Sequence, residues 1–298
     1  MEQVARAGWI RVLCLMPLLS ACAAEPNEAG PVVDTGRILV PGSSLFYEVS
    51  GTGDPVILLH GGNLDRRMWD AEFAALSSSH RVIRYDARGY GKSEPADTAF
   101  QAHEDLRVLM EALRIDSAAL IGLSLGGRIA MDFAVAYPAR VTRLILAAPG
   151  ISGGQWSANT DTAWLVEGRK ALAAKDSVAL ARSWLGSAYI RSALRDSARR
   201  PWIEQLVVDQ APFWGNIIRN GDLEAPANPP AAGRLRDLKA PILLFVGSED
   251  TRFIHEVAQA IEREAPRVRR VDLPGTGHMI NLEAPERFLS EVRTFLAR

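Results

Sequence analysis

The feature that most constrains the fold is an alternation of short apolar runs with segments of helical spacing, from about residue 37 to the C-terminus. The apolar runs occupy 55–60, 81–86, 118–124, 143–149, 241–247 and 268–275. Helical spacing of apolar residues is found in 100–113, 124–136, 254–264 and 284–296. This alternation predicts an α/β fold, with a mostly parallel central sheet flanked by helices. Residues 37–42 and 45–51 are expected to form an opening hairpin.

Residues 151–236 interrupt the alternation, because they contain several helical stretches and no convincing strand. We interpret them as a helical cap inserted into an α/β core made of 37–150 and 237–298. Five tryptophans lie in this cap, at positions 156, 164, 184, 202 and 214. Since large aromatic side chains are chiefly packing residues, most should form the cap's own core, and one or two should line a pocket.

The N-terminus has the pattern of an export signal. Two arginines precede the apolar stretch VLCLMPLLS, which is too short to span a bilayer. The following LSAC (19–22) resembles the bacterial lipobox, in which the signal is cut before a cysteine that then receives lipid. The sequence therefore predicts a lipoprotein signal at 1–21, a lipidated Cys22 and a flexible tether at 22–36. An ordinary secretory signal with an incidental cysteine is the alternative.

This resemblance implies an exported protein that is anchored to a membrane on its periplasmic side. Ala23 stands where an aspartate would favour the inner membrane, which favours the outer membrane. No disulfide is expected, because Cys14 would be lost with the signal and Cys22 consumed by lipid.

Charge and histidine spacing exclude several classes of partner. The chain of 298 residues has 34 basic and 35 acidic residues, a balance that gives no electrostatic footprint for nucleic acid. The five histidines are scattered without the spacing of metal ligands, and there is no cysteine cluster. We expect a small-molecule substrate, no cofactor and no metal.

The segment GLSLGG (122–127) joins a predicted strand to a predicted helix. A sharp turn there would push the hydroxyl of Ser124 out of the sheet, and Gly122 and Gly126 would remove the side chains that collide in such a turn. By itself the pattern fits either a nucleophile or a bare turn. A nucleophilic serine also needs a base and an acid that orients the base.

Candidates for both partners follow Ser124 at the ends of predicted strands. His278 lies in a glycine-bearing loop after the last strand, whereas His255 begins a helix, where a surface or capping role fits better. Asp250 follows the strand at 241–247, and we prefer it to its neighbour Glu249 as the acid. Helix capping is the alternative role for Asp250.

With these residues in place, the chain resembles an α/β-hydrolase over about 37–298. Five segments carry the resemblance: HGGNLDRRMW (60–69), YDARGYGKS (85–93), GLSLGG (122–127), GSED (247–250) and GTGH (275–278). The order of Ser124, Asp250 and His278 is the family's order for its catalytic triad. Within the family the chain is most similar to capped esterases and lactonases, including the group around 3-oxoadipate enol-lactonase.

The resemblance also implies further roles. Backbone N–H groups of Leu125 and Gly62, with Asn63 as the alternative to Gly62, would form the oxyanion hole. His60 would brace the oxyanion loop, and the loop around Asp86 would be a rigid turn.

These observations favour a serine hydrolase that cleaves esters or lactones of small, largely apolar substrates through an acyl-enzyme. Two other enzyme activities stay open, a proline aminopeptidase and a carbon–carbon bond hydrolase. The aminopeptidase would hold its substrate's amino group with acidic cap residues, for which the candidates are Glu167, Glu204, Asp209 and Glu224. A lipid-anchored ligand-binding protein on the same scaffold is the alternative without catalysis.

Overall fold

The computed structural model describes residues 33–157, 163–216 and 223–298. The signal predicted at 1–21, Cys22 and the tether up to residue 32 lie outside the described residues. Strand β1 begins at Val33, so the last four residues predicted as tether are part of the sheet. The side chains of Val33, Asp34 and Thr35 are exposed, which explains why their hydrophobicity gave no signal of a strand. Backbone pairing with the next strand holds them.

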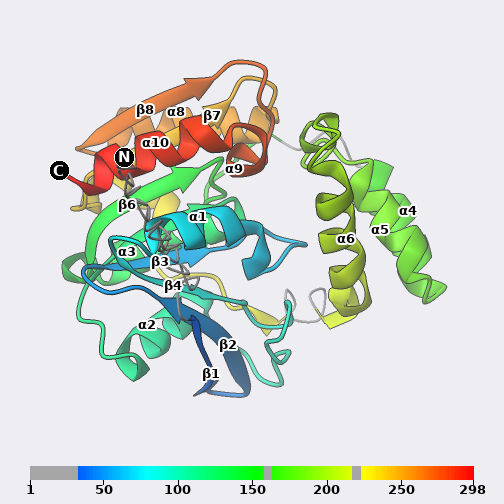
Figure 1. The fold of residues 1–298 in the computed structure, drawn as a ribbon, viewed down its shortest axis with the longest axis horizontal. Helices are drawn as coiled ribbons and strands as arrows, with labels where there is room; N and C mark the ends of the chain where they lie inside the picture. Colours follow the sequence, from blue (N-terminus) through cyan, green and yellow to red (C-terminus); the bar gives the residue numbers. More distant parts are fainter. Residues whose placement is uncertain (1–32, 158–162, 217–222) are drawn as a thin grey trace, which may run out of the picture. The chain divides into compact units, whose positions relative to one another are not determined.

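Eight strands form one sheet in the order β1-β2-β4-β3-β5-β6-β7-β8 (Figure 1). Their bounds are β1 Val33–Val40, β2 Ser43–Ser50, β3 Pro55–Leu59, β4 Arg81–Tyr85, β5 Ala118–Leu123, β6 Val141–Ala147, β7 Ile242–Gly247 and β8 Val268–Leu273. The hairpin β1–β2 is antiparallel and β2 pairs antiparallel with β4, whereas β3 to β8 pair in parallel. The predicted sheet and its opening hairpin are therefore confirmed.

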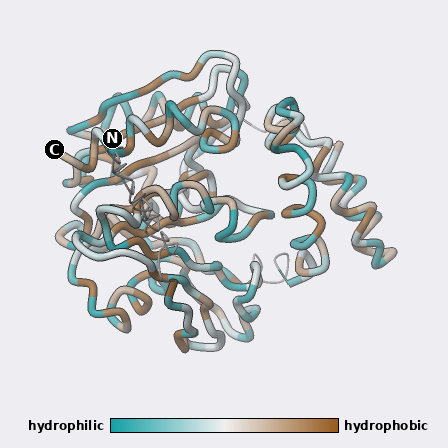
Figure 2. The backbone as a smooth tube through the Cα atoms, in the orientation of Figure 1, coloured by the Kyte–Doolittle hydropathy of each residue, from teal (hydrophilic) through white to brown (hydrophobic). Residues whose placement is uncertain are grey.

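The helices of the core cover both faces of the sheet. They are α1 Asp70–Leu76, α2 Ala102–Ala112, α3 Leu125–Ala136, α8 Arg252–Glu264, α9 Ile280–Glu283 and α10 Pro285–Leu296. Alternate residues of β3 serve different faces: Ile57 belongs to the hydrophobic cluster that includes residues of α2, α3 and α8, and Leu58 belongs to the one that includes residues of α1 and α10. Figure 2 shows hydrophobic residues along the strands of the sheet, as burial on both faces requires.

The predicted helical insertion is present between β6 and β7. It contains α4 Ala163–Ala173, α5 Ser177–Leu185 and α6 Arg200–Gln210, which stand together beside the sheet in Figure 1. Buried residues of α5 and α6, such as Leu180 and Ile203, extend the hydrophobic cluster that also contains Leu58. The insertion is thus joined to the core through apolar contacts as well as through its two connecting segments.

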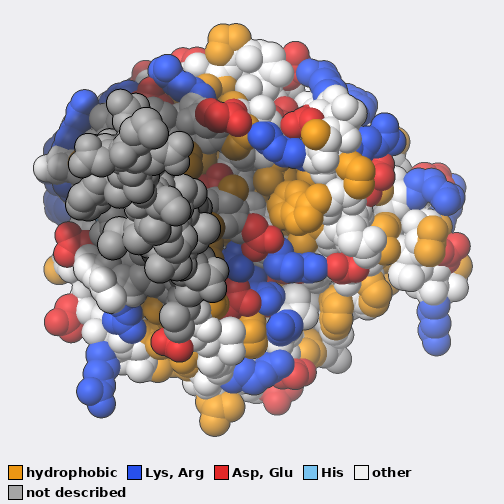
Figure 3. All heavy atoms as spheres, in the orientation of Figure 1, with side chains coloured by type: hydrophobic (Ala, Val, Ile, Leu, Met, Phe, Trp, Pro, Cys, Tyr) orange, Lys and Arg blue, Asp and Glu red, His pale blue; other side chains and the backbone are white. Residues whose placement is uncertain are grey.

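Two surface properties bear on partners. On the face drawn in Figure 3, positive and negative side chains are interspersed among apolar ones, in keeping with the near-zero net charge. No helix in the described ranges is both long enough and apolar enough to cross a membrane.

Candidate active site

Ser124 occupies a strained turn between β5 and α3. Its φ is +52° and its ψ is −110°, a backbone conformation that residues other than glycine rarely adopt. A Cβ on Gly122 would lie 2.4 Å from the carbonyl of Gly126, and a Cβ on Gly126 would lie 2.1 Å from the Leu59 oxygen. The turn can therefore form only because both positions lack side chains, which is the geometry the sequence predicts.

The structure brings His278 and Asp250 together, although 27 residues separate them in the chain. His278 Nδ1 lies 2.9 Å from Asp250 Oδ2 and 3.1 Å from Oδ1. Both side chains are almost fully buried. Asp250 also accepts a hydrogen bond from the backbone N–H of Thr251, at 2.6 Å. With Nδ1 donating to the carboxylate, the imidazole keeps Nε2 available as a proton acceptor.

Ser124 and His278 line one cavity of about 200 Å³. Its walls are mostly aromatic and aliphatic: the other lining residues are Gly62, Asn63, Trp164, Trp184, Tyr189, Phe253, Ile254 and Met279. Two of the five cap tryptophans are among them, in agreement with the sequence prediction. An apolar cavity of this size accommodates a small group, since pockets for larger ligands are typically about 300–1,000 Å³.

The predicted oxyanion donors lie beside this cavity. Gly62 and Asn63 line it, and Leu125 is the first residue of α3, where backbone N–H groups have no partner within the helix. A Cβ built on Gly62 would lie 4.0 Å from the Leu125 Cβ, so the two segments adjoin. The helix N-terminus also favours negative charge that develops nearby.

His60 fixes the loop that carries Gly62. Its Nε2 accepts a hydrogen bond from the backbone N–H of Ala87 at 3.0 Å, so Nδ1 is the protonated nitrogen and donates to the Gly61 carbonyl at 2.8 Å. The side chain is buried and both nitrogens are engaged. This arrangement supports the bracing role that the resemblance implies.

The loop after β4 is held by its buried carboxylate. Asp86 accepts hydrogen bonds from Arg66, through both backbone and guanidinium, and from the backbone N–H of Lys92, and Ser93 donates to its carbonyl. Burial raises the pKa of Asp86, and the Arg66 guanidinium opposes that rise. These bonds hold the loop in a turn, in keeping with the expectation.

The acidic cap residues that an aminopeptidase would use are already paired with basic side chains. The pairs are Glu167–Lys170, Glu204–Arg200, Asp209–Arg67 and Glu224–Arg128, at 2.7–2.8 Å. None of the four acids is among the described residues that line the cavity of Ser124. The alternative acid Glu249 is half-exposed and pairs with Arg195 at 2.7 Å.

Tyr189 is a site residue that sequence reasoning missed. Its ring packs edge-to-face against His278, with 4.8 Å between ring centroids, and stacks on Trp184 at 5.7 Å. Tyr189 lies in a turn between α5 and α6, where neither spacing nor a motif distinguishes it. The nearby tryptophans were the only sequence signal of an aromatic wall.

Comparisons with known proteins agree with the fold. The sequence model of a family described as "Alpha/beta hydrolase family" matches residues 56–291. A 3-oxoadipate enol-lactonase 1 from Acinetobacter baylyi is 25% identical over 88% of this chain and 96% of that protein. A 2-hydroxy-6-oxononadienedioate/2-hydroxy-6-oxononatrienedioate hydrolase from Burkholderia vietnamiensis is 29% identical over 85% of this chain and 91% of its own. The solved structure of a thermophilic esterase from Thermogutta terrifontis superposes with a TM-score of 0.72 at 29% identity, over 89% of this chain and 98% of the esterase.

Proposed function

The chain belongs to the alpha/beta hydrolase family, and we propose that it is a serine hydrolase that cleaves carboxylic esters or lactones of small, largely apolar substrates. One observation carries this proposal. Ser124, in a strained strand-to-helix turn, lines the same cavity as His278. The Nδ1 atom of His278 is hydrogen-bonded to the buried Asp250. A bare turn requires neither the histidine nor the acid.

The proposed mechanism assigns one task to each group. Ser124 Oγ attacks the substrate carbonyl while His278 Nε2 accepts its proton, and Asp250 orients the ring and stabilises its charged form. Backbone N–H groups of Leu125 and Gly62 stabilise the oxyanion, with Asn63 as the alternative to Gly62. The alcohol leaves with the proton from His278. Water, activated by the same histidine, then attacks the acyl-enzyme and releases the acid and the free serine.

Size and polarity of the cavity support the substrate class. Trp164, Trp184 and Phe253 provide flat apolar walls, and the volume of about 200 Å³ limits the group that can enter beside Ser124. The similarity to an enol-lactonase and to an esterase supports the same bond types.

Carbon–carbon bond hydrolysis is the second candidate, since the Burkholderia relative named for that class of substrate is 29% identical. A peptidase of the proline aminopeptidase type has less support, because the cap acids it needs are paired elsewhere. A ligand-binding protein without catalysis would have no use for the bond between His278 and Asp250.

A fluorophosphonate probe with a panel of p-nitrophenyl esters, lactones and a vinylogous diketone acid tests these functions. We expect the probe to label Ser124, identified by peptide mass spectrometry, and expect the Ser124→Ala variant to stay unlabelled. Turnover of esters or lactones supports the first candidate, and turnover of the diketone acid alone supports the second. Absence of both labelling and turnover in folded protein would leave only the binding role.

We also propose that lipid on Cys22 anchors the protein to a membrane, because LSAC matches the lipobox in residue type and position. In a bacterial host fed a labelled fatty acid, Cys22→Ser should abolish labelling and release the protein from membranes. Cys14→Ser is the matched control, since that cysteine would be removed with the signal. Membrane retention of the Cys22→Ser variant would contradict the anchor.

A further inference from the structure

Glu283 holds the loop of the histidine from both sides. It ends α9, and its carboxylate accepts a hydrogen bond from the backbone N–H of Gly277 at 2.7 Å and one from that of Met279 at 3.0 Å. These two N–H groups flank His278 directly in the chain. Hydrogen bonds to a charged carboxylate are stronger than those between neutral groups. One side chain therefore holds the backbone on both sides of His278.

A segment of the cap reaches the same carboxylate. Ser192, in the connection between α5 and α6, donates its hydroxyl to Glu283 Oε1 at 3.0 Å. A Cβ on Gly277 would lie 2.1 Å from the Ser192 Oγ, so the hydroxyl occupies space that a side chain at position 277 would need. Three residues earlier, Tyr189 packs its ring on the imidazole of His278. We call residues 189–192 the cap arm.

We propose that the cap arm, acting through Glu283, is a positioning element for His278, so that the seating of the cap determines the rate of the chemical step. This inference rests on the proposed function, because it assumes that His278 moves the proton of Ser124. Glu283 and Ser192 are positioning residues. Neither lines the cavity among its described residues, and both act through the backbone of the histidine.

The carboxylate is the chemical requirement of this arrangement. Three donors converge on Glu283, two from backbone N–H groups and one from a hydroxyl. A glutamine has a single acceptor oxygen, and its NH₂ would face one of the N–H groups, donor against donor. Glu283→Gln therefore keeps the size of the side chain but cannot accept hydrogen bonds from both N–H groups that flank His278.

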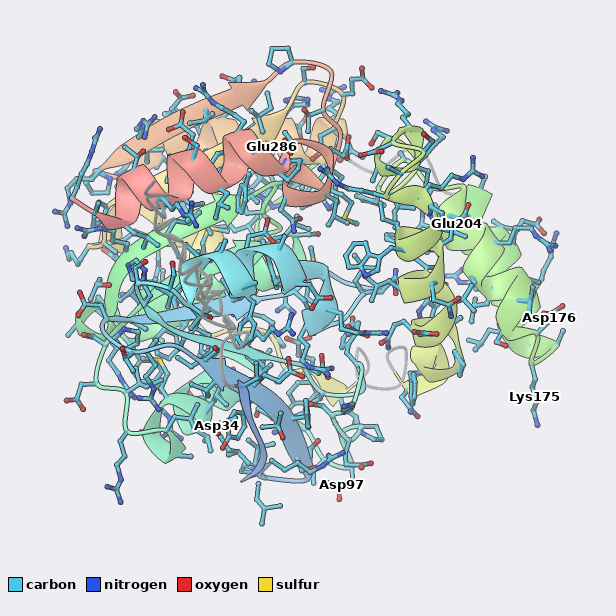
Figure 4. All side chains as sticks on the ribbon, viewed as in Figure 1. Asp34, Asp97, Lys175, Asp176, Glu204 and Glu286 are labelled. Carbon is cyan, nitrogen blue, oxygen red and sulfur yellow. The ribbon has the colours of Figure 1, made fainter. Side chains whose placement is uncertain are left out.

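The first test compares Glu283→Gln with Glu286→Gln in hydrolysis of p-nitrophenyl butyrate. Glu286 lies at the start of α10 and is exposed, so it is the matched control (Figure 4). We expect kcat of Glu283→Gln, counted per serine that reacts with the fluorophosphonate probe, to fall about 10- to 100-fold, because small misplacement of a catalytic group costs up to about 10²-fold. We expect KM to change by less than about 3-fold, since substrate contacts are kept.

A fall in kcat no larger than that of the control would overturn the proposal. A purely structural role would lower the unfolding midpoint and the fraction of reactive protein, and would leave kcat per reactive serine unchanged. That result would also overturn it.

The second test isolates the cap arm. Ser192→Ala removes the hydroxyl that joins the cap to Glu283, whereas Ser183→Ala removes a hydroxyl that bonds within α5, to the Leu180 carbonyl. We expect Ser192→Ala to lower kcat about 3- to 10-fold and the control to leave it unchanged, and we expect no further loss when Ser192→Ala is added to Glu283→Gln. Full activity of Ser192→Ala, or additive losses, would overturn the role of the arm.

These outcomes are separable from failure of the proposed function. If the wild-type protein neither reacts with the probe nor turns over any ester or lactone, the proposed function has failed. If it does both and the variants match their controls, only the positioning role has failed.

Discussion

Ser124 has a backbone conformation that costs about 1–3 kcal/mol, and its surroundings hold it there. Gly122 and Gly126 provide the space, and the first turn of α3 follows at once. Other residues without a proposed task also have positive φ, Ala148 among them, so the strain alone assigns no role. What distinguishes Ser124 is that its strained turn stands at the end of β5, beside the cavity that it lines together with His278.

Replacement of the proposed nucleophile gives the first prediction. Ser124→Ala should lower kcat by about 10⁴- to 10⁶-fold, because the three residues of such a triad act as a unit. The ester that the wild type hydrolyses fastest is the substrate for this measurement, at protein concentrations that reveal traces of activity. Turnover within tenfold of wild type would exclude the mechanism.

The second prediction decides between neighbouring acids. Asp250→Asn should reduce kcat about 10⁴-fold, because an amide in place of the carboxylate stabilises the wrong imidazole tautomer. Glu249→Gln should change kcat by less than about 3-fold, since an exposed ion pair such as that with Arg195 is worth little. The reverse outcome in the same assay would assign the acid to Glu249.

At the scale of elements, the inserted helices determine which groups can approach Ser124. Trp164 on α4 and Trp184 on α5 pack edge-to-face, with 4.9 Å between ring centroids, and together line the cavity. Trp184 is buried, so it serves the cap's own packing as well. Under the proposed function, two helices that contribute no reacting group would therefore limit the size of the substrate.

Trp164→Ala tests this limit. Removal of the indole enlarges the cavity, so the ratio of kcat/KM for p-nitrophenyl octanoate to that for the acetate should rise, by about 10-fold or more for several extra methylenes in an apolar pocket. Trp202→Ala is the control, because Trp202 is 39% exposed and does not line this cavity. An unchanged ratio would show that another wall sets chain-length preference.

At the scale of the whole molecule, folding buries a carboxyl that the proposed mechanism does not use. Glu72 on α1 is 2% exposed, and Asn281 Nδ2 lies 3.4 Å from its Oε2. Burial raises the pKa of Glu72 to about 7 from an ordinary value of 4.5. The folded protein therefore binds a proton there that the unfolded chain has already released between these pH values.

The sign of the resulting pH dependence follows. A carboxyl whose pKa is raised by folding destabilises the native state as pH increases from about 4.5 to about 7, by up to about 3 kcal/mol for a shift of this size. The side chain at position 72 cannot ionise in Glu72→Gln. The free energy of unfolding of this variant, measured in urea, should therefore increase relative to that of the wild type between pH 5 and pH 8. An equal difference between the two proteins at both pH values would contradict this account, and Glu286→Gln is the exposed control.

Much of the fold could be predicted because its signals are local. Five of the six apolar runs predicted as strands contain one, and the run at 143–149 overlaps β6, which begins two residues earlier. The helical segments at 100–113, 124–136 and 284–296 contain α2, α3 and α10, and the segment at 254–264 overlaps α8, which also begins two residues earlier. Helix α1 was not predicted, because its seven residues are too few for a clear period. The first residues of β1 were missed because their partners, and not their hydrophobicity, make them a strand.

The sequence by itself determined the class of fold and the candidates Ser124, Asp250 and His278, because each stands at the end of an apolar run, and parallel strands bring their carboxyl ends to one edge. Their catalytic roles stay a proposal that the variants above will test. The tertiary structure alone decided that Tyr189 packs on the histidine, that Ser192 reaches Glu283 and that Glu72 is buried. The physical reason is that these contacts join side chains from separate elements. A periodic sequence pattern indicates which face of its helix or strand a residue lies on, but not which residues pack against that face.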